Sequence, residues 1–425
     1  MADNPDRPAG FGAVLGVAEF RALFAAYTIS VAGDQFARVA LSVLVYDRTG
    51  SAGLTALTYA LTFLPDLFGG PLLSGLADRY PRRRVMISGD AARTVLVALM
   101  AIPGEPLALV ATLLVIVQLI GSPATAARAA ITPQLLGEEA YPVGQAVLNT
   151  ANQAAQVLGF AGGGALIAGI GADGVLLADA ATFAASALLV AIGVRNPGRP
   201  GQVAEARAAW WPQLRGGAVL VWSDRRLRAL ICFACLSGLY IACEALAAPY
   251  AADLHGGPTL VGLLFAGFAL GAAVGMLVLA RLPARVRLRL MPVLAVGSCL
   301  VLIGCFARPG AVLTITLFAV SGLASSYQVT ASTSFVRAVP DGRRGQAFGL
   351  AVTAMKVAQG LGVSLAGLAG ERIAAHQVVA AAGLLGVIAA LGVAWLWQVA
   401  NRPLPPGAPA TAPGGQWPAR ARENP

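Results

Sequence analysis

The chain has 425 residues, of which 57% are hydrophobic and 12% are charged, and its formal net charge is +10. Soluble globular proteins carry about 25% charged residues, so this composition excludes a secreted domain, a cytosolic enzyme and a disordered chain. The mean hydropathy of +0.72 indicates instead a protein that crosses a membrane several times.

A helix that spans a bilayer needs about 20 mostly apolar residues. The sequence predicts two sets of six such segments. The first set is Phe20–Tyr46, Ala52–Ala77, Val85–Pro103, Leu107–Pro133, Tyr141–Ile170 and Gly174–Val194. The second set is Leu230–Tyr250, Leu260–Ala280, Leu290–Ala307, Val312–Pro340, Gln346–Ala369 and Ala374–Val399. The predicted fold class is an all-α membrane protein whose twelve transmembrane helices form two pseudo-symmetric six-helix bundles.

The same reading divides the chain into five parts. We predict a cytoplasmic N-terminal segment, a first bundle, a cytoplasmic linker, a second bundle and a disordered cytoplasmic tail, at residues 1–19, 20–194, 195–229, 230–400 and 401–425. The tail is rich in Pro, Gly and Ala, which is typical of a segment that cannot bury a core.

Arginine placement predicts the orientation. Most arginines in the predicted loops fall on one side of the membrane, and those on the other side are only Arg48, Arg308 and Arg372. Positively charged loops stay in the cytoplasm, so we expect a cell-membrane protein with both termini cytoplasmic. This placement also explains the basic charge, and no nucleic-acid partner is expected.

The two halves contain a weak internal repeat. The triplet Gly-Gln-Ala at 144–146 recurs at 345–347, and Ala-Gln-Val-Leu-Gly at 155–159 resembles Ala-Gln-Gly-Leu-Gly at 358–362. Each offset crosses six predicted spans, so the halves share one orientation. Parallel repeats of this kind place a central cavity between two bundles.

The most specific motif lies between the second and third spans and reads Ser-Gly-Leu-Ala-Asp-Arg-Tyr-Pro-Arg-Arg-Arg-Val at 74–85. It resembles the major facilitator superfamily, whose loop here reads Gly-x-Leu-Ala-Asp-Arg-x-Gly-Arg-Arg. The matching residues are Asp78, Arg79, Arg82 and Arg83, whereas Ser74 and Pro81 stand where the family has glycine. A carboxylate at a helix end can bind a facing helix N-terminus or an arginine. The resemblance therefore implies a cytoplasmic gate.

Further motifs resemble one group of that family, the twelve-span drug:proton antiporters of the macrolide-efflux and enterobactin-exporter types. They are Gly33-Asp34, Leu-Val-Tyr-Asp-Arg-Thr-Gly at 44–50, Asp90-x-x-Arg93, and Ala127-Arg128-x-Ala130-x-x-Pro133-x-Leu135. The fifth span departs from the group because it lacks a Gly-Pro pair. We assign Asp90, Arg93 and Arg128 to the gate. The resemblance implies secondary active export of a small amphipathic compound by proton antiport.

Ionisable residues inside spans are costly and rarely face lipid. Asp34 precedes Arg38 by one helical turn, so we expect the two to pair. A carboxyl group held between apolar burial and a nearby arginine can bind and release a proton. Our proton-coupling candidates are Asp34, Glu244 and Asp66, and Asp179 is a further acid within a span.

Four amides in the fifth span lie on one helical face, namely Asn149, Asn152, Gln153 and Gln156. The repeat maps Gln153 and Gln156 onto Lys356 and Gln359, and Lys356 is the only lysine in the chain. We expect Gln153 and Lys356 to face each other across the pseudo-twofold axis and line the substrate path. The alternative is that Lys356 neutralises a buried acid.

A second polar wall is possible on the fourth and tenth spans, where Gln118, Ser122, Thr125, Ser321, Ser325 and Gln328 share helical faces. Hydrogen bonding between helices explains these residues equally well, and Gln328 is the member that we place on the substrate path.

The predicted function is export of a drug, antibiotic or secondary metabolite by proton antiport and alternating access. A lysolipid or metabolite flippase on the same scaffold and a non-transporting membrane sensor remain alternatives. No Ser/His/Asp set, phosphate loop or Cys/His metal cluster is evident, so neither an enzyme nor a metal or cofactor is expected. The expected partners are a small-molecule substrate, membrane lipids and protons, and we predict a monomer.

Overall fold

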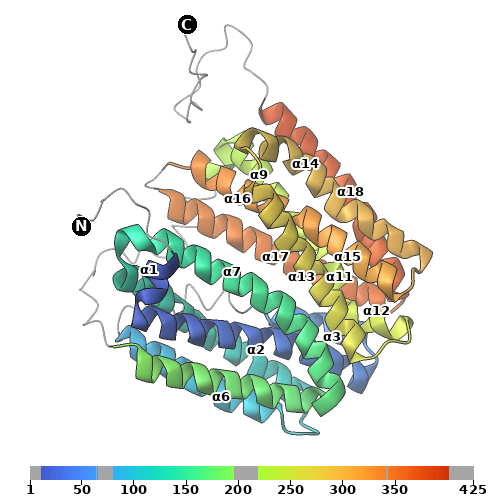
Figure 1. Cartoon of the computed structure of the whole chain (residues 1–425). Coiled ribbons are helices and arrows are strands. Elements are labelled where there is room, and N and C mark those ends of the chain that lie inside the picture. Colours follow the sequence, from blue (N-terminus) through green and yellow to red (C-terminus); the bar gives the residue numbers. More distant parts are fainter. Residues whose placement is uncertain (1–10, 64, 66–79, 196–218, 341–342, 402–425) are drawn as a thin grey trace, which may run out of the picture.

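The computed structural model describes residues 11–63, 65, 80–195, 219–340 and 343–401. Within these ranges the regular secondary structure is helical (Figure 1). Asp66, Asp78 and Arg79 lie outside the described residues, as do most of the predicted linker and the tail beyond Asn401.

The N-terminal half contains α1 (Phe11–Gly16), α2 (Ala18–Thr49), α3 (Ala52–Leu61), α6 (Arg82–Met100) and α7 (Leu107–Gly193). A straight helix as long as the 87-residue α7 would measure about 130 Å, against a hydrocarbon core of about 30 Å. The helix instead reverses direction at Gly137 and Gly171, whose φ angles are 71° and 73°. Only glycine adopts this conformation readily. These two glycines divide α7 into segments 107–136, 138–170 and 172–193.

The C-terminal half is also helical. It contains α9 (Arg225–Cys235), α10 (Ser237–Tyr240), α11 (Ala242–Ala245), α12 (Ala247–Asp253), α13 (Pro258–Ala280), α14 (Ala284–Leu300), the 3-10 helix η1 (Val301–Ala307), α15 (Ala311–Ser325), α16 (Tyr327–Ala338), α17 (Arg344–Gly370) and α18 (Ala375–Ala400). In this half the predicted seventh, ninth and tenth spans are each divided into shorter consecutive helices.

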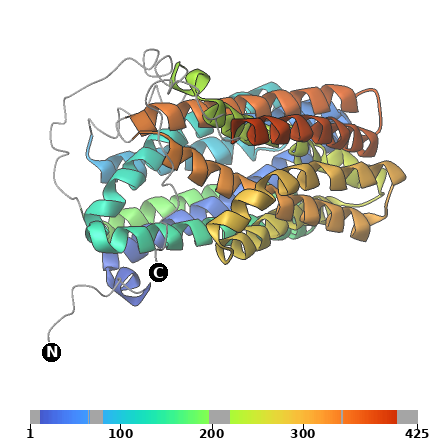
Figure 2. The same cartoon turned by 90° about the horizontal axis from the view of Figure 1, so that it is seen from above.

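The two halves form separate bundles that meet along part of their length. In the N-terminal bundle α2 and α6 pack on α7, and in the C-terminal bundle α13 packs on α15 and α14 on α18. Between bundles, α7 contacts α13 and α3 contacts α17. Figure 1 shows the ribbons converging where α3 and α12 lie and diverging toward α1 and α9, and Figure 2 shows the helices of both bundles running lengthwise.

Among the described residues, eight helices are long and apolar enough to cross a membrane, and α7 counts as one of them. Leucine, isoleucine and valine side chains on their outer faces are exposed, including Ile192, Val312 and Leu365, at 79%, 80% and 65%. Such a surface suits hydrocarbon rather than water. The all-α membrane architecture is thus confirmed, whereas the count of twelve helices stays a prediction because α3 ends beside residues outside the described part.

Candidate functional site

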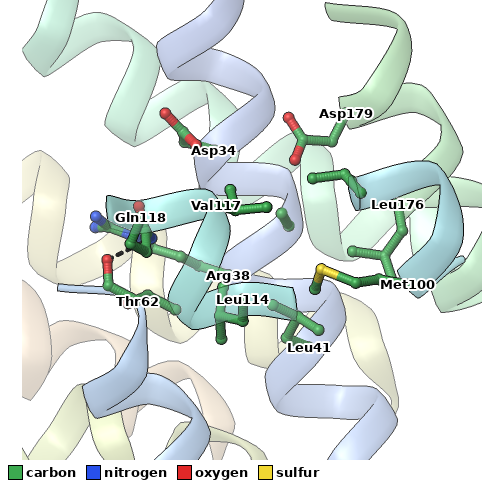
Figure 3. A pocket seen from close by; sticks show the side chains of 12 residues that line it. Asp34, Arg38, Leu41, Thr62, Met100, Leu114, Val117, Gln118, Leu176 and Asp179 are labelled. Atoms are coloured by element: carbon green, nitrogen blue, oxygen red, sulfur yellow. Dashed lines mark hydrogen bonds between the residues drawn. The ribbon is translucent and has the colours of Figure 1, made fainter. Parts of the chain in front are cut away.

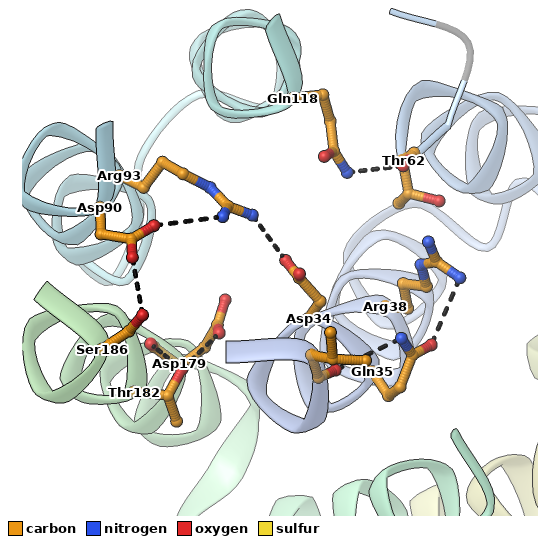
Figure 4. A network of polar contacts seen from close by, with 11 residues as sticks. Asp34, Gln35, Arg38, Thr62, Asp90, Arg93, Gln118, Asp179, Thr182 and Ser186 are labelled. Carbon is orange, nitrogen blue, oxygen red and sulfur yellow. Dashed lines mark hydrogen bonds and ion pairs between the residues drawn. The ribbon is translucent and has the colours of Figure 1, made fainter. Parts of the chain in front are cut away.

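A network of charged side chains lies inside the N-terminal bundle (Figure 4). An Nη2 of Arg93 on α6 donates to Asp34 Oδ1 on α2 at 2.9 Å, and its Nη1 lies 3.7 Å from Asp90 Oδ1. Ser186 on α7 donates to the other oxygen of Asp90 at 2.7 Å. We call Asp34, Arg93, Asp90 and Ser186 the acid network. It connects three helices, because Arg93 binds Asp34 on α2 and Asp90 accepts the hydrogen bond from Ser186 on α7.

The expected pair of Asp34 and Arg38 is not formed. Arg38 instead donates through Nη1 to Gln35 Oε1 at 3.3 Å, one turn back on the same helix. A guanidinium on a neighbouring helix approaches Asp34 end-on, whereas the Arg38 side chain is directed away from Asp34 (Figure 4). Asp34 is therefore paired with Arg93 of another helix rather than with Arg38 of its own helix.

Arg93 and Arg128 are held by aromatic rings as well as by charge. The guanidinium carbon of Arg93 lies 3.8 Å from the centroid of Phe183, and that of Arg128 lies 4.7 Å from the centroid of Tyr27. Cations stack favourably on ring faces, and more so away from water. Asp90 and Arg93 thus lie within the packed bundle, only 1% and 6% exposed. The gate role assigned to Asp90, Arg93 and Arg128 stays a prediction.

A small cavity of about 20 Å³ adjoins the acid network (Figure 3). Its polar lining consists of Asp34, Arg38, Thr62, Gln118 and Asp179, and the remaining lining is apolar. Gln118 closes one wall by donating to the carbonyl of Thr62 at 2.6 Å. A cavity of this size accommodates a water molecule. The site therefore brings two carboxyl groups, Asp34 and Asp179, to one small polar space.

The two bundles meet in an aromatic seam, defined here by Tyr59, Phe160, Glu244 and Phe265. Tyr59 on α3 donates its hydroxyl to Glu244 Oε2 on α11. The ring of Phe265 lies 5.8 Å from that of Tyr59 and 5.0 Å from that of Phe160. The proton candidate Glu244 is thus a cross-bundle hydrogen-bond acceptor.

Beyond the aromatic seam the bundles touch backbone to backbone. A Cβ added to Gly164 on α7 would lie 2.7 Å from the carbonyl oxygen of Pro258 and 2.8 Å from the Cα of Gly262 on α13. Likewise, a Cβ on Gly367 of α17 would lie 2.6 Å from the Cβ of Ala56 on α3. Glycine therefore permits the close approach of both helix pairs.

A carboxylate joins the bundles at the same end of the molecule. Glu371, just after α17, accepts hydrogen bonds through Oε1 from Ser51 Oγ and Gly53 N, each at 2.6 Å. The bonds from Ser51 and Gly53 hold the pKa of Glu371 below its ordinary value. We call Glu371, Ser51 and Gly53 the carboxylate latch. Together with the aromatic seam and the glycine contacts, it closes this end of the molecule.

The four amides of the fifth predicted span lie on the α7 segment 138–170, close to the face of that segment that meets α13. Gln156, Phe160 and Gly164 are spaced four residues apart and so share one side of the helix. Gln156 donates to Asn152 Oδ1 at 3.2 Å and, like Gln153, is partly buried, whereas Asn149 is exposed. Their role on the substrate path stays a prediction.

Lys356 reaches the opposite bundle. Its Nζ lies 3.4 Å from the carbonyl oxygen of Phe63, just beyond α3. This contact joins α17 to the turn that follows α3, and the expected approach of Lys356 to Gln153 stays a prediction. Gln359, one turn later on α17, is partly buried.

Gln328 is used inside the C-terminal bundle. Its amide nitrogen lies 3.1 Å from both the carbonyl oxygen of Ala234 and the hydroxyl of Tyr240, at the break between α9 and α10. Tyr327 donates to the carbonyl of Phe233 at 2.9 Å. These bonds satisfy backbone carbonyls that the break frees, so the geometry favours the interhelical alternative for Gln328.

The arginines of the family motif that the structure describes bind their own bundle. Arg82 Nη1 donates to the carbonyl of Ala130 at 3.0 Å, and Arg83 donates to the carbonyl of Ala191. Ala191 lies in the last turn of α7, where helix carbonyls lack intrahelical partners, whereas Ala130 lies six residues before the end of its segment. Asp66, Asp78 and Arg79 lie outside the described residues, so their roles stay predictions.

Two functional residues were not predicted from sequence. Tyr59 lies in an apolar span and resembles a packing residue, and Glu371 occupies a short predicted loop in which an acid is unremarkable. Only a cross-bundle contact reveals either residue. The internal repeat relates equivalent positions in the two bundles. It does not indicate which residues of one bundle contact the other bundle.

Comparison with known proteins agrees with this architecture. The profile of the Major Facilitator Superfamily matches residues 23–250 and 242–422. The chain is 28% identical over 291 residues to the multidrug efflux pump Tap of Mycobacterium tuberculosis, covering 63% of this chain and 67% of that protein. It is 23% identical over 383 residues to macrolide efflux protein A of Streptococcus pyogenes, covering 88% of this chain and 94% of that protein.

A further relative is the transporter YvqJ of Bacillus subtilis, 28% identical over 274 residues, where the match covers 62% of this chain and 64% of that protein, less than two thirds of it. Among solved structures, the nucleoside transporter NupG has a TM-score of 0.69 at 14% identity over 89% of this chain and 99% of that chain. A bacterial homologue of the iron transporter ferroportin in its inward-facing state has a TM-score of 0.65 at 17% identity over 90% of this chain and 99% of that chain. The chain belongs to the Major Facilitator Superfamily.

Proposed function

We propose that this protein exports small amphipathic compounds across the cell membrane by alternating access. The observation that carries the proposal is the aromatic seam, where the two bundles meet at one end of the molecule through a tyrosine, a carboxylate and two phenylalanine rings. The similarity to proteins named multidrug and macrolide efflux pumps supports export of drug-like molecules. Family membership agrees with the expectation of a transport protein rather than an enzyme.

The geometry suggests how the cycle proceeds. The bundles are joined at the end that contains the carboxylate latch, and their ribbons diverge toward the other end (Figure 1). Arginine placement assigns the diverging end to the cytoplasm. A compound would enter between the bundles from that side, below the aromatic seam. Rocking of the bundles would then break the seam and latch and close the cytoplasmic end.

Proton antiport is the proposed driving reaction, with Asp34 and Glu244 as coupling residues. A carboxylate accepts a stronger hydrogen bond than a neutral carboxylic acid does. Protonation of Glu244 would therefore weaken its bond from Tyr59 and loosen the seam. Asp34 is paired with Arg93 at 2.9 Å, so its protonation would release a guanidinium inside the N-terminal bundle. In antiport, these residues would take up a proton from outside while the seam is open and would release it toward the cytoplasm, which would restore the bond between Tyr59 and Glu244.

The test is transport by the full chain in proteoliposomes, with ethidium and a macrolide as probes. An imposed pH gradient should accelerate efflux of at least one probe. Asp34→Asn or Glu244→Gln should abolish that acceleration, whereas Asp47→Asn, which changes an exposed carboxylate, should not. An efflux rate that does not change when the pH gradient is imposed would contradict antiport. Transport of lysolipid but not of the probes would identify a flippase, and binding without flux would identify a sensor.

A further inference from the structure

The acid network and its cavity contain an acid that the proposed cycle does not use. Asp179, on the last segment of α7, is 1% exposed and lines the same cavity as Asp34. Its Oδ1 lies 3.2 Å from the hydroxyl of Thr182. Figure 3 shows the two carboxyl groups beside one another at this cavity, approached from α2 and from α7.

Positive charge in this region is already engaged. Arg93 is paired with both Asp34, at 2.9 Å, and Asp90, at 3.7 Å. Arg38 binds Gln35, and Arg128 lies on the ring of Tyr27. Asp179 forms no ion pair among the described residues, and a buried carboxylate without an ion-pair partner is strongly disfavoured, so the group binds a proton instead. The geometry therefore favours the neutral acid at Asp179 while Arg93 is bound to Asp34.

The cavity gives this acid a route for proton exchange. Its volume of about 20 Å³ suffices for a water molecule. The lining includes Arg38, whose buried Nε makes no hydrogen bond to the described residues. A water here would have the carboxyl groups of Asp34 and Asp179 and the guanidinium of Arg38 as neighbours. Water next to an acid is the simplest acceptor for its proton.

Gly33 couples this acid to movement of α2. A Cβ added to Gly33 would lie 2.3 Å from Asp179 Oδ1 and 2.2 Å from Thr182 Oγ1. The backbone of α2 therefore rests directly on the carboxyl group, one residue before Asp34. A shift of α2 relative to α7 must change the surroundings of both acids together.

From these contacts we propose that Asp179 binds and releases the exchanged proton. Its protonation state depends on whether Arg93 is paired with Asp34 or with Asp179. While Arg93 is bound to Asp34, Asp179 keeps its proton. When Asp34 is protonated, Arg93 turns to Asp179, whose O–H bond breaks and whose proton passes to water in the cavity. One proton enters at Asp34 and one leaves at Asp179, so charge in the network is conserved. This proposal rests on the proton antiport proposed above.

The groups that face Asp179 are few and come from three helices. Asp34 and Arg38 line the same cavity from α2, and Arg93 approaches from α6, where it is paired with Asp34. Thr182 belongs to α7 itself. Any pH dependence assigned to Asp179 must therefore change when Asp34 or Arg93 is changed.

Infrared spectroscopy of the full chain in lipid tests the protonation directly, without a substrate. A carboxylic acid band should be present at neutral pH in the unsubstituted protein and should lose intensity in Asp179→Asn. Asp47→Asn serves as the control and should leave the band unchanged. An unchanged band in Asp179→Asn, or its absence at neutral pH in the unsubstituted protein, would overturn the proposal.

A second variant keeps the test decisive even if Asp179→Asn does not fold. Asp34→Asn removes the 2.9 Å partner of Arg93, so the guanidinium becomes free to bind Asp179. The carboxylic acid band should then disappear at a lower pH than in the unsubstituted protein. A band with the same pH dependence in both proteins would show that Arg93 does not control Asp179.

Transport separates this proposal from the proposed function. In proteoliposomes loaded with ethidium, Asp179→Asn should move the dye down its gradient but should no longer respond to an imposed pH gradient. If the unsubstituted protein does not move ethidium or a macrolide at all, the proposed function fails while the infrared result still decides the state of Asp179. If Asp179→Asn keeps its pH-gradient response, the proton carrier is another residue.

Discussion

At the scale of single residues, the carboxylate latch makes one acid responsible for a contact between two bundles. Glu371 accepts one hydrogen bond from Ser51, the residue before α3, and one from Gly53, the second residue of α3. Glu371→Ala removes the acceptor, so backbone amides at 51–56 should exchange hydrogen faster in mass-spectrometric measurements. Glu371→Gln keeps an acceptor oxygen and should have a smaller effect. Equal exchange in all three proteins would contradict a latch.

The latch should also depend on pH. Its bonds lower the pKa of Glu371 from an ordinary value of 4.5, so the latched state favours the carboxylate. The charge-dependent stabilisation is therefore present above about pH 4.5 and is lost as the pH falls through the lowered pKa. The difference in exchange between the unsubstituted protein and Glu371→Gln should be present at pH 7 and vanish in strong acid. A difference that persists in strong acid would show that charge is not involved.

Tyr59 permits a second residue-scale prediction. Tyr59→Phe removes only the hydroxyl that binds Glu244, and losing a hydrogen bond to a charged group costs about 1.5–3 kcal/mol. Amides at 242–250 should exchange faster, while ring packing against Phe265 is kept. Tyr80→Phe, at a side chain that is 56% exposed, is the matched control. Unaltered exchange in Tyr59→Phe would remove Glu244 from the closure of the bundles.

Sequence reasoning located the charged residues of the site but not their partners. Helical spacing predicts neighbours on the same helix, and so it paired Asp34 with Arg38. The actual partner, Arg93, lies on α6 and is brought near by packing, which no spacing rule describes. For the same reason Tyr59 and Glu371 escaped notice, because their roles exist only across the two bundles. For Gln328 the predicted position on a polar helix face was correct. Its hydrogen bonds, however, are made to residues of its own bundle.

At the scale of helices, the glycine pair between α7 and α13 sets how closely the bundles approach. Gly164→Ala would place a Cβ within 2.8 Å of the Gly262 backbone, and overpacking of this kind costs about 1–3 kcal/mol. The variant should open this end of the molecule, seen as faster hydrogen exchange at 258–265. Gly169→Ala lies on the same α7 segment with nothing within 4 Å, so it should be neutral. Equal exchange in both variants would contradict a close-packed closure.

Helix existence was predictable, and helix ends were less so. Sequence placed breaks between 133 and 141 and between 170 and 174, and the chain reverses at Gly137 and Gly171. Pro133 was expected to end a helix, but the helix continues past it because a proline removes only one of many backbone bonds. The predicted seventh span is interrupted at Leu236, Ile241 and Leu246. Pro249, three residues after Leu246, cannot donate to the carbonyl of Ala245 and so marks the third break. No proline lies within a turn of the first two breaks.

At the scale of the whole molecule, orientation in the membrane is the prediction that most of the proposed cycle depends on. Arginine-rich loops should be cytoplasmic. Green fluorescent protein fused after Asn401 should fluoresce, and alkaline phosphatase inserted at 308–310 should be active outside the cytoplasm. The reverse pattern would place the carboxylate latch in the cytoplasm and would turn the proposed exporter into an importer. Fusions after Gly193 and at 103–105 provide an independent pair.

The two-bundle plan was the most predictable feature of all. Hydropathy alone indicated a membrane protein, the short repeat indicated two related halves, and the motif at 74–85 indicated the family. The hydropathy signal is strong because it is dictated by the solvent, and the short repeat, weak by itself, gains weight because it agrees with the order of the spans. The cavity beside Asp34 and the latch at Glu371 depend on a few side chains each, and so they became visible only with the coordinates.

The glycine contact between α7 and α13 has a consequence for evolution under drug pressure. Any amino-acid substitution at Gly164 or Gly262 replaces a hydrogen with a larger side chain, so it can only widen the spacing. Strains selected for survival on a new toxic compound should therefore accumulate changes at Gly164 or Gly262. These changes would shift the equilibrium between the inward-open and outward-open forms. Such variants would gain a broader cargo range without any change to the surface that touches the cargo.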